Sequence, residues 1–140
     1  QKIIMDQQIK ESSESTDSKK RILDNLKEYC KQMYSALARG ELDAFGKILD
    51  EAWNMKRKLS PKISNERIDE IYLKAKEAGA IGGKITGAGG GGCMIFFCKS
   101  NHEHKVSEVL QQSGAKVIDF SFEKSGMVSW ELKRESRKIK

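Results

Sequence analysis

The sequence predicts an α+β domain in which an antiparallel sheet carries helices on one face and is preceded by a helical hairpin. Three observations predict this fold class. Before residue 80, apolar residues recur at steps of three and four, which is typical of amphipathic helices. Two apolar segments then flank a run of glycines, and two segments that alternate apolar with polar residues lie near the end of the chain.

The first two predicted helices form a hairpin. One apolar stripe begins near Asp17 and ends at Gly40, because glycine readily takes the left-handed conformation that closes a helix. A second stripe starts at Leu42 and stops before Pro61, the single proline. The short connection makes the helices antiparallel neighbours. Both stripes are expected to face the core; they comprise Ile22, Leu23, Leu26, Tyr29, Cys30, Met33 and Leu37, then Leu42, Phe45, Ile48, Leu49, Ala52, Trp53 and Leu59.

Two more helices are predicted by their end signals. Ser64 or Asn65 starts the third, since both are good N-caps, and Gly79 ends it. The segment Ser100–Glu103 has the spacing of a capping box, and the apolar positions after it continue a fourth helix to Gly114.

Four strands are predicted around these helices. Lys84–Thr86 is short, whereas Cys93–Cys98 is a continuous apolar run of the kind found in buried strands. Lys116–Phe122 and Val128–Leu132 alternate and are separated by a turn. In the third strand Ile118, Phe120 and Phe122 share one face, which we expect to lie against the core.

Composition indicates one soluble domain. The chain has 140 residues, of which 38% are hydrophobic and 33% charged, and no stretch approaches the roughly 20 apolar residues of a membrane span. It opens without a secretory pattern, so we expect a cytoplasmic protein, and its first residue, Gln1, suggests processing or a longer parent chain. We divide it into a lead-in arm (1–16), a domain (17–132) and a basic tail (133–140).

Charge and cysteine usage exclude several function classes. The net charge is +6, from 26 basic and 20 acidic residues, but no basic stripe interleaves with aromatic residues, so a nucleic-acid partner is not expected. An odd number of cysteines, Cys30, Cys93 and Cys98, argues against a disulfide framework, and we expect reduced, buried thiols. His102 and His104 have no third ligand nearby in the sequence, so no metal site is predicted.

The segment Gly87–Gly92 is the one motif that carries chemistry. Five of its six residues are glycine, which costs conformational entropy unless the backbone needs unusual angles or close approach. Successive N–H groups in such a turn converge on an anion, usually a phosphate. A floppy hairpin tip is the plain alternative. A dinucleotide fingerprint would require a helix to follow, and a Walker loop would require Lys and Ser or Thr where Cys93 and Met94 stand.

A third phosphate-loop interpretation is a resemblance. Lys84-Ile85-Thr86-Gly87-Ala88-Gly89-Gly90-Gly91-Gly92-Cys93, followed by an apolar strand, resembles the third motif of the GHMP small-molecule kinases nearly letter for letter. The resemblance covers roughly residues 18–132, and further residues narrow it to the D-glycero-D-manno-heptose 7-phosphate kinase branch. They are Trp53, Lys56, Leu59, Ile63, Ser64, Asn65, Ile68, Asp69, Tyr72, Ala75 and the segment Gly79–Lys84.

The resemblance implies an ATP-dependent kinase that phosphorylates the anomeric hydroxyl of a heptose 7-phosphate. In that family the first domain supplies the ATP-phosphate loop and the groups that serve Mg²⁺, and the second domain, ferredoxin-like in fold, supplies the loop that borders the acceptor. This chain resembles the second domain only. We therefore expect the missing N-terminal domain to be its partner, the chain alone to be inactive, and a homodimer to be a further possibility.

The resemblance also assigns the candidate site residues. The loop toward ATP and substrate comprises Thr86, Gly87, Ala88, Gly89, Gly90, Gly91 and Gly92. The candidate ligands for a sugar phosphate are Lys56, Lys58 and Lys84, for each of which a solvated lysine is the plain alternative. No catalytic residue and no metal ligand is expected within this chain.

Two rival functions stay open at this point. Another GHMP sugar kinase, of the fucose type, would share the same loop. A free-standing α+β binding or dimerisation module would have kept the fold and lost catalysis.

Overall fold

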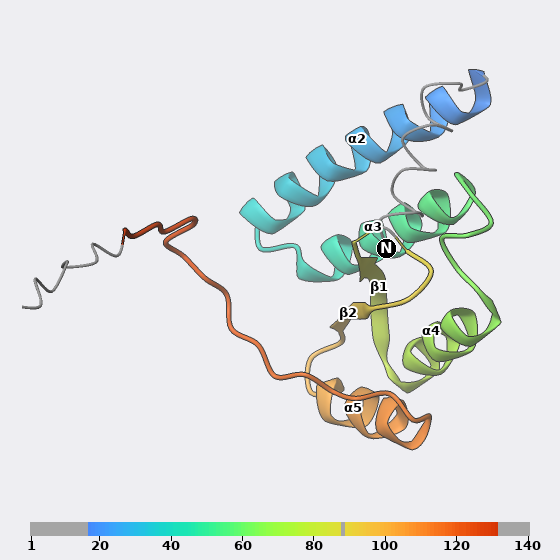
Figure 1. The fold of residues 1–140 in the computed structure, drawn as a ribbon, viewed down its shortest axis with the longest axis vertical. Coiled ribbons are helices and arrows are strands. Elements are labelled where there is room, and N and C mark those ends of the chain that lie inside the picture. The colour runs from blue at the N-terminus through green and yellow to red at the C-terminus, as the bar shows by residue number, and fades with distance from the viewer. Residues whose placement is uncertain (1–16, 88, 132–140) are drawn as a thin grey trace, which may run out of the picture.

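The computed structural model describes residues 17–87 and 89–131. The predicted arm 1–16 and basic tail 133–140 lie outside the described residues, as do Ala88 and Leu132. The α+β fold class is confirmed, with a helical hairpin preceding an antiparallel sheet (Figure 1). The elements are α2 (Asp17–Ala38), α3 (Leu42–Arg57), α4 (Glu66–Ala78), β1 (Ala80–Thr86), β2 (Cys93–Cys98) and α5 (Glu103–Gln112).

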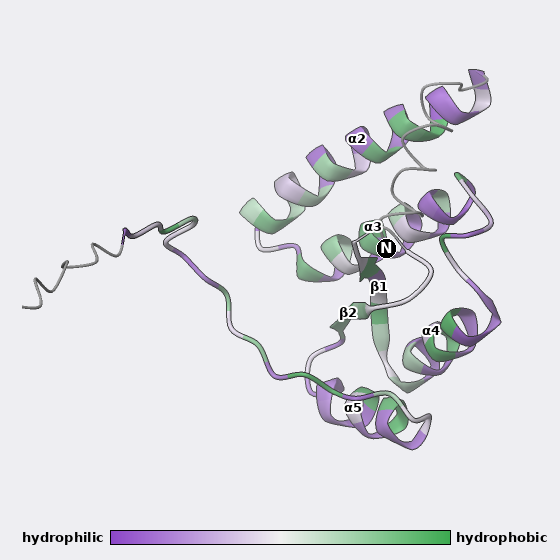
Figure 2. Cartoon of the chain, in the orientation of Figure 1, coloured by the Kyte–Doolittle hydropathy of each residue, from purple (hydrophilic) through white to green (hydrophobic). Residues whose placement is uncertain are grey.

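Helices α2 and α3 form the predicted hairpin and run side by side (Figure 1). Gly40 has φ +73°, and the N–H of Glu41 donates to the carbonyl of Ala36 at 2.9 Å, which satisfies an end carbonyl of α2. Helix α2 covers α3 only partly, because Ala36 is its one fully buried residue. Hydrophilic and hydrophobic residues accordingly alternate along α2 in Figure 2. The expectation that both stripes are buried was wrong at three positions, which are exposed: Cys30, Leu37 and Leu42.

Strand β1 begins four residues earlier than predicted, at Ala80, and pairs with β2 so that Ile85 faces Met94. The first part of β1, before Lys84, contains two glycines, a pattern that favours a loop in sequence-based prediction. In this strand the glycines, which lack side chains, allow close packing. A Cβ atom built on Gly82 would lie 2.7 Å from the backbone nitrogen of Asp50, so helix α3 could not approach the sheet as it does.

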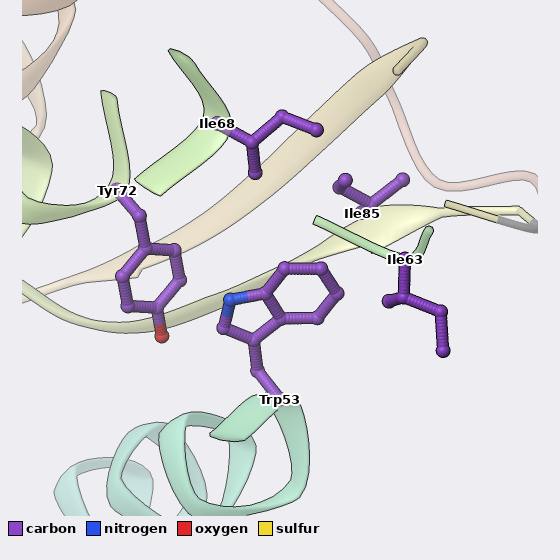
Figure 3. Packing of buried hydrophobic residues seen from close by; sticks show 5 residues of the cluster. All are labelled: Trp53, Ile63, Ile68, Tyr72 and Ile85. Atoms are coloured by element: carbon purple, nitrogen blue, oxygen red, sulfur yellow. The ribbon is translucent and has the colours of Figure 1, made fainter. Parts of the chain in front are cut away.

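The main core lies between α3, α4 and β1 and is drawn in Figure 3. Its largest member, Trp53, is 1% exposed and stacks obliquely beside Tyr72, with ring centroids 6.2 Å apart. Burying each such apolar side chain stabilises the fold by about 1.5–3 kcal/mol. The cluster comprises Trp53, Ile63, Ile68, Tyr72 and Ile85.

Helix α4 begins as predicted, since the side chain of Asn65 accepts a hydrogen bond from the N–H of Ile68 at 3.0 Å. The capping box predicted for α5 was wrong. The residue that caps α5 is His102, which makes no side-chain capping bond, and Asn101 just before it has φ +63°. That left-handed residue turns the chain out of the box geometry. Helix α5 packs on α4 and on the start of β1 through a second buried cluster, which comprises Ala75, Ala78, Ala80 and Val106.

The C-terminal segment, residues 115–131, overturns two strand predictions. It runs away from α5 as an extended chain without strand pairing, so Lys116–Phe122 and the described part of Val128–Leu132 are not strands (Figure 1). Among the residues described here, the sheet has two strands. Phe120 and Phe122 are 65% and 83% exposed, which contradicts their expected place in the core. Alternation specifies a face only where a partner strand is present to pair with.

No helix between residues 17 and 131 is both long enough and apolar enough to cross a membrane. The cysteines are free, as predicted, but the expectation that they are buried was wrong. Cys30 lies on the outer side of α2 and Cys93 at the first position of β2, and both are exposed.

Candidate functional site

The glycine loop, Gly87–Gly92, connects β1 to β2, and its backbone angles explain why it is rich in glycine. All five of its glycines have positive φ, between +73° for Gly90 and +150° for Gly91. Residues with a Cβ rarely adopt these angles, and each such residue would cost about 1–3 kcal/mol of strain. The loop conformation therefore requires glycine at each of these positions.

The loop is fastened to the segment between α3 and α4. The N–H of Gly90 donates to the carbonyl of Ile63 at 2.9 Å. A Cβ on Gly89 would lie 2.8 Å from that same carbonyl oxygen and 2.9 Å from the Ile63 Cα. Because Ile63 is itself fully buried in the core, the loop rests on a fixed support. This excludes the floppy-tip alternative for the described part of the loop.

The stem of the loop is also held. The Thr86 hydroxyl donates to the carbonyl of Cys93 at 3.0 Å, across the last strand pair. The ammonium of Lys56, from the end of α3, donates to the carbonyl of Gly87 at 3.0 Å. The end of α3 therefore meets the two paired strands at the start of the loop.

Two of the predicted lysines belong to the elements at this stem, Lys56 to α3 and Lys84 to β1. Burial, and then the positive charge of Lys84, lower the pKa of Lys56 below its ordinary value. Neither lysine forms an ion pair with any residue that the structure describes, whereas Lys74 and Lys76 both pair with carboxylates. The stem therefore carries the positive charge of Lys56, and in the loop that follows the N–H of Gly91 donates to none of the described residues. That combination suits an anion.

Lys58 lies elsewhere. It is exposed and lines an open hollow of about 260 Å³ between the end of α3 and the start of α4. The interior of the hollow is occupied by a part-buried network in which Asp69 accepts from Arg57 at 2.6 Å and from Ser64 at 2.5 Å. The hollow is lined by Arg57, Lys58, Ser60, Pro61, Ser64, Asn65, Glu66 and Asp69.

Sequence reasoning missed the residues that support the loop. Ile63 was noted only as part of the resemblance. It supports the loop through its backbone carbonyl, which every residue has, so the sequence gives no sign of this role. Tyr72 also orders β1: its hydroxyl donates to Asp50 at 2.6 Å and accepts from the N–H of Gly83 at 3.1 Å. Within the described residues no group of three or more His, Cys, Asp or Glu side chains is placed to hold a metal ion.

Comparison with known proteins identifies the class of protein that this fold and loop define. The family described as "GHMP kinases C terminal" matches residues 33–116, which is more than half of the chain. The chain therefore belongs to the GHMP kinase family, as the glycine loop predicted.

Three individual kinases are similar to this chain. A D-glycero-alpha-D-manno-heptose 7-phosphate kinase of Campylobacter jejuni is 36% identical over 101 residues, covering 72% of this chain and 30% of that protein. A bifunctional fucokinase/GDP-fucose pyrophosphorylase of Arabidopsis thaliana is 34% identical over 87 residues, covering 62% and 8%. A mevalonate kinase of Pyrococcus furiosus is 34% identical over 65 residues, covering 46% and 19%. The chain thus spans less than a third of the length of each of these relatives.

A solved structure confirms the fold. The chain superimposes on L. major mevalonate kinase in complex with R-mevalonate with a TM-score of 0.70 at 22% identity, covering 78% of this chain and 33% of that one.

Proposed function

We propose that this chain is the C-terminal domain of an ATP-dependent sugar kinase that phosphorylates the anomeric hydroxyl of D-glycero-D-manno-heptose 7-phosphate to give the 1,7-bisphosphate. The observation that carries the proposal is the glycine loop. Its glycines have positive φ angles, its Gly90 N–H donates to the Ile63 carbonyl, and Lys56 donates to the Gly87 carbonyl at its start. The heptose assignment is supported by the similarity to the Campylobacter jejuni kinase over 72% of the chain.

In this proposal the protein works mainly by positioning and by neutralising charge on phosphate oxygens, which is what phosphoryl transfer requires. The segment Thr86–Gly92 offers backbone N–H groups to ATP and the acceptor without intruding side chains. Lys56, Lys58 and Lys84 are our candidates for the acceptor phosphate, and Lys56 and Lys84 adjoin the loop. The described residues provide no cluster for Mg²⁺, so we assign Mg²⁺ and most ATP contacts to an N-terminal domain. We place the reaction in the cytoplasm, where ATP is available.

A fucose-type kinase is the second candidate, favoured by the similarity to the Arabidopsis thaliana fucokinase. The two candidates differ in the acceptor, since fucose carries no phosphate. A lysine pair without carboxylate partners favours the phosphorylated acceptor.

The test is an assay of phosphoryl transfer by the full-length protein, monitored by ³¹P NMR. ATP is the donor, and heptose 7-phosphate, unphosphorylated heptose and fucose are compared as acceptors. We expect a new anomeric phosphate signal with the heptose phosphate only. Transfer to fucose alone would favour the second candidate. We expect the 140-residue chain by itself to show no transfer, and robust turnover by it would contradict the division of labour proposed here.

A further inference from the structure

The last turn of α3 contacts the glycine loop and also the side chain of a residue in α4. Lys56 donates directly to the Gly87 carbonyl at the start of the loop. The next residue, Arg57, donates to the carboxylate of Asp69 at 2.6 Å, and both of these side chains are partly shielded from water, at 33% and 40% exposed. Asp69 lies in the first turn of α4. The second contact therefore joins the end of α3 to the start of α4, next to the segment that supports the loop.

The carboxylate of Asp69 also binds that supporting segment. Its Oδ1 accepts a hydrogen bond from the Ser64 hydroxyl at 2.5 Å, while its Oδ2 accepts from Arg57. Hydrogen bonds to an ionised group are stronger than those between neutral groups. The N-cap of α4 is a different residue, Asn65, whose side chain accepts from a helix N–H. Helix capping therefore does not account for the contacts of Asp69.

Ser64 bears on the loop through the peptide group that it shares with Ile63. The carbonyl of Ile63, which accepts from the N–H of Gly90 at 2.9 Å, belongs to the planar unit that joins Ile63 to Ser64. The Ile63 side chain, buried in the main core, holds one end of this unit (Figure 3). The bond from the Ser64 hydroxyl to Asp69 holds the other end. Because both ends are held, the direction of the carbonyl that supports the loop is fixed.

We infer that Asp69 is a positioning residue for the glycine loop, acting through Ser64 and the Ile63 carbonyl. The inference rests on the proposed function for the reaction that the loop serves, whereas the contacts themselves do not. A negative charge in the first turn of a helix also stabilises that helix, which is the plain alternative role of Asp69. The two roles differ at Gly90, because only a positioning role links the carboxylate to the loop.

The first experiment measures, by NMR of the 140-residue chain, how fast the Gly90 amide proton exchanges with water. We expect Asp69→Ala and Ser64→Ala each to speed this exchange about tenfold, because the hydrogen bond to Ile63 then opens more often. Ser64→Thr keeps the hydroxyl and should exchange as the unaltered chain does. Glu70→Ala is the matched control, since Glu70 is the next residue of α4 and its carboxylate is also paired with cations. It should leave the Gly90 amide unchanged.

Unchanged exchange at Gly90 in both Asp69→Ala and Ser64→Ala, with spectra that show an intact fold, would overturn the inference. Equally fast exchange in Glu70→Ala would overturn it too, because the effect would then come from a weakened helix. Fast exchange in Ser64→Thr would show that the hydroxyl is not what holds the peptide group.

The second experiment measures kcat/KM of the full-length enzyme for its sugar phosphate. Since a small displacement of a positioning element is costly to catalysis, Ser64→Ala should lower kcat/KM at least tenfold, and Ser64→Thr should restore it. An active enzyme whose kcat/KM is unchanged in Ser64→Ala, although Gly90 exchanges faster, would contradict the positioning role. An enzyme inactive on every sugar tested, whose isolated chain still shows the response at Gly90, would refute the proposed function and leave the support of the loop by Asp69 standing.

Discussion

Strands β1 and β2, which the glycine loop joins, and the C-terminal segment 115–131 are both rich in apolar residues. Only the strands pack into the core of the domain. In β1 and β2, Ile85 is fully buried and Met94 and Phe96 pack against the core cluster. In residues 115–131 the apolar side chains stay exposed, from 37% at Val117 to 94% at Met127. The difference lies in partners. The first region has α3 and α4 packed against it, whereas the second has a pair of rings, Phe120 and Phe122, packed on each other.

This contrast teaches that alternation and hydrophobicity permit a strand but do not produce one. A strand needs a neighbour for its backbone groups and a layer for its buried face. Strand β1 pairs with β2 and packs against α3, which approaches it closely at Gly82. The loop is held in addition by the bond from Gly90 to Ile63.

The largest expected effect is on the fold of the first region. Ile85→Ala removes a fully buried side chain from the centre of the core and should lower the free energy of unfolding by about 2–5 kcal/mol. Ile118→Ala makes the same chemical change in the C-terminal segment, where the side chain is 58% exposed, and should alter it by less than about 0.5 kcal/mol. Urea unfolding of both variants measures the contrast, which equal losses would abolish.

The next effect is on function and leaves the core in place. Gly89→Val places a Cβ 2.8 Å from the carbonyl oxygen of Ile63 and imposes φ +106° on a β-branched residue, so the loop must leave its support. Displacing a substrate-positioning element by about 1 Å is enough for a loss of roughly hundredfold. We expect kcat/KM of the full-length kinase to fall by at least that factor. Gly126→Val, at a φ of +69° with open space around it, is the matched control in the C-terminal segment.

Activity retained in the Gly89→Val variant would show that the loop does not need Ile63. Activity lost equally in the Gly126→Val variant would assign the C-terminal segment a role that its exposure does not suggest.

The same contrast shows what the sequence can and cannot predict. Helix ends at Gly40 and Asn65 follow from local chemistry, and the glycine loop was found because five glycines in six residues, between two apolar strands, call for a structural reason. The support at Ile63 and the bond between Lys56 and Gly87 were not predictable, because both depend on a backbone carbonyl brought near by the tertiary fold. The strand at Phe120 was predicted wrongly for the converse reason, since the pattern was present and the partner was not.

A smaller effect is expected where α4 supports β1. Tyr72→Phe removes a hydroxyl that donates to Asp50 and accepts from Gly83, leaving a buried N–H without its partner, at a cost of about 1–3 kcal/mol. Burial, and then the hydrogen bond to Asp50, raise the pKa of Tyr72 above its ordinary value of 10.0. Above that pH the unfolded chain loses this proton while the folded chain keeps it, so stability falls as pH rises.

We therefore expect the unaltered chain to lose stability above pH 10 more steeply than the Tyr72→Phe variant. Thermal unfolding of both proteins at a series of alkaline pH values measures the difference. Parallel curves would mean that the hydroxyl is as accessible in the folded chain as in the unfolded one.

The smallest effect should come from removing most of the second region. Ending the chain at Ala115 keeps the bond from its N–H to the carbonyl of Leu110, which closes α5, and deletes the exposed apolar residues beyond it. Since those side chains bury little surface, the free energy of unfolding should change by less than about 1 kcal/mol. Phe122→Ser, at a residue 83% exposed, is the milder version of the same change and should leave the melting temperature unaltered. A large loss in the shortened chain would mean that residues 116–140 pack somewhere in solution, and the two regions would then differ in degree only.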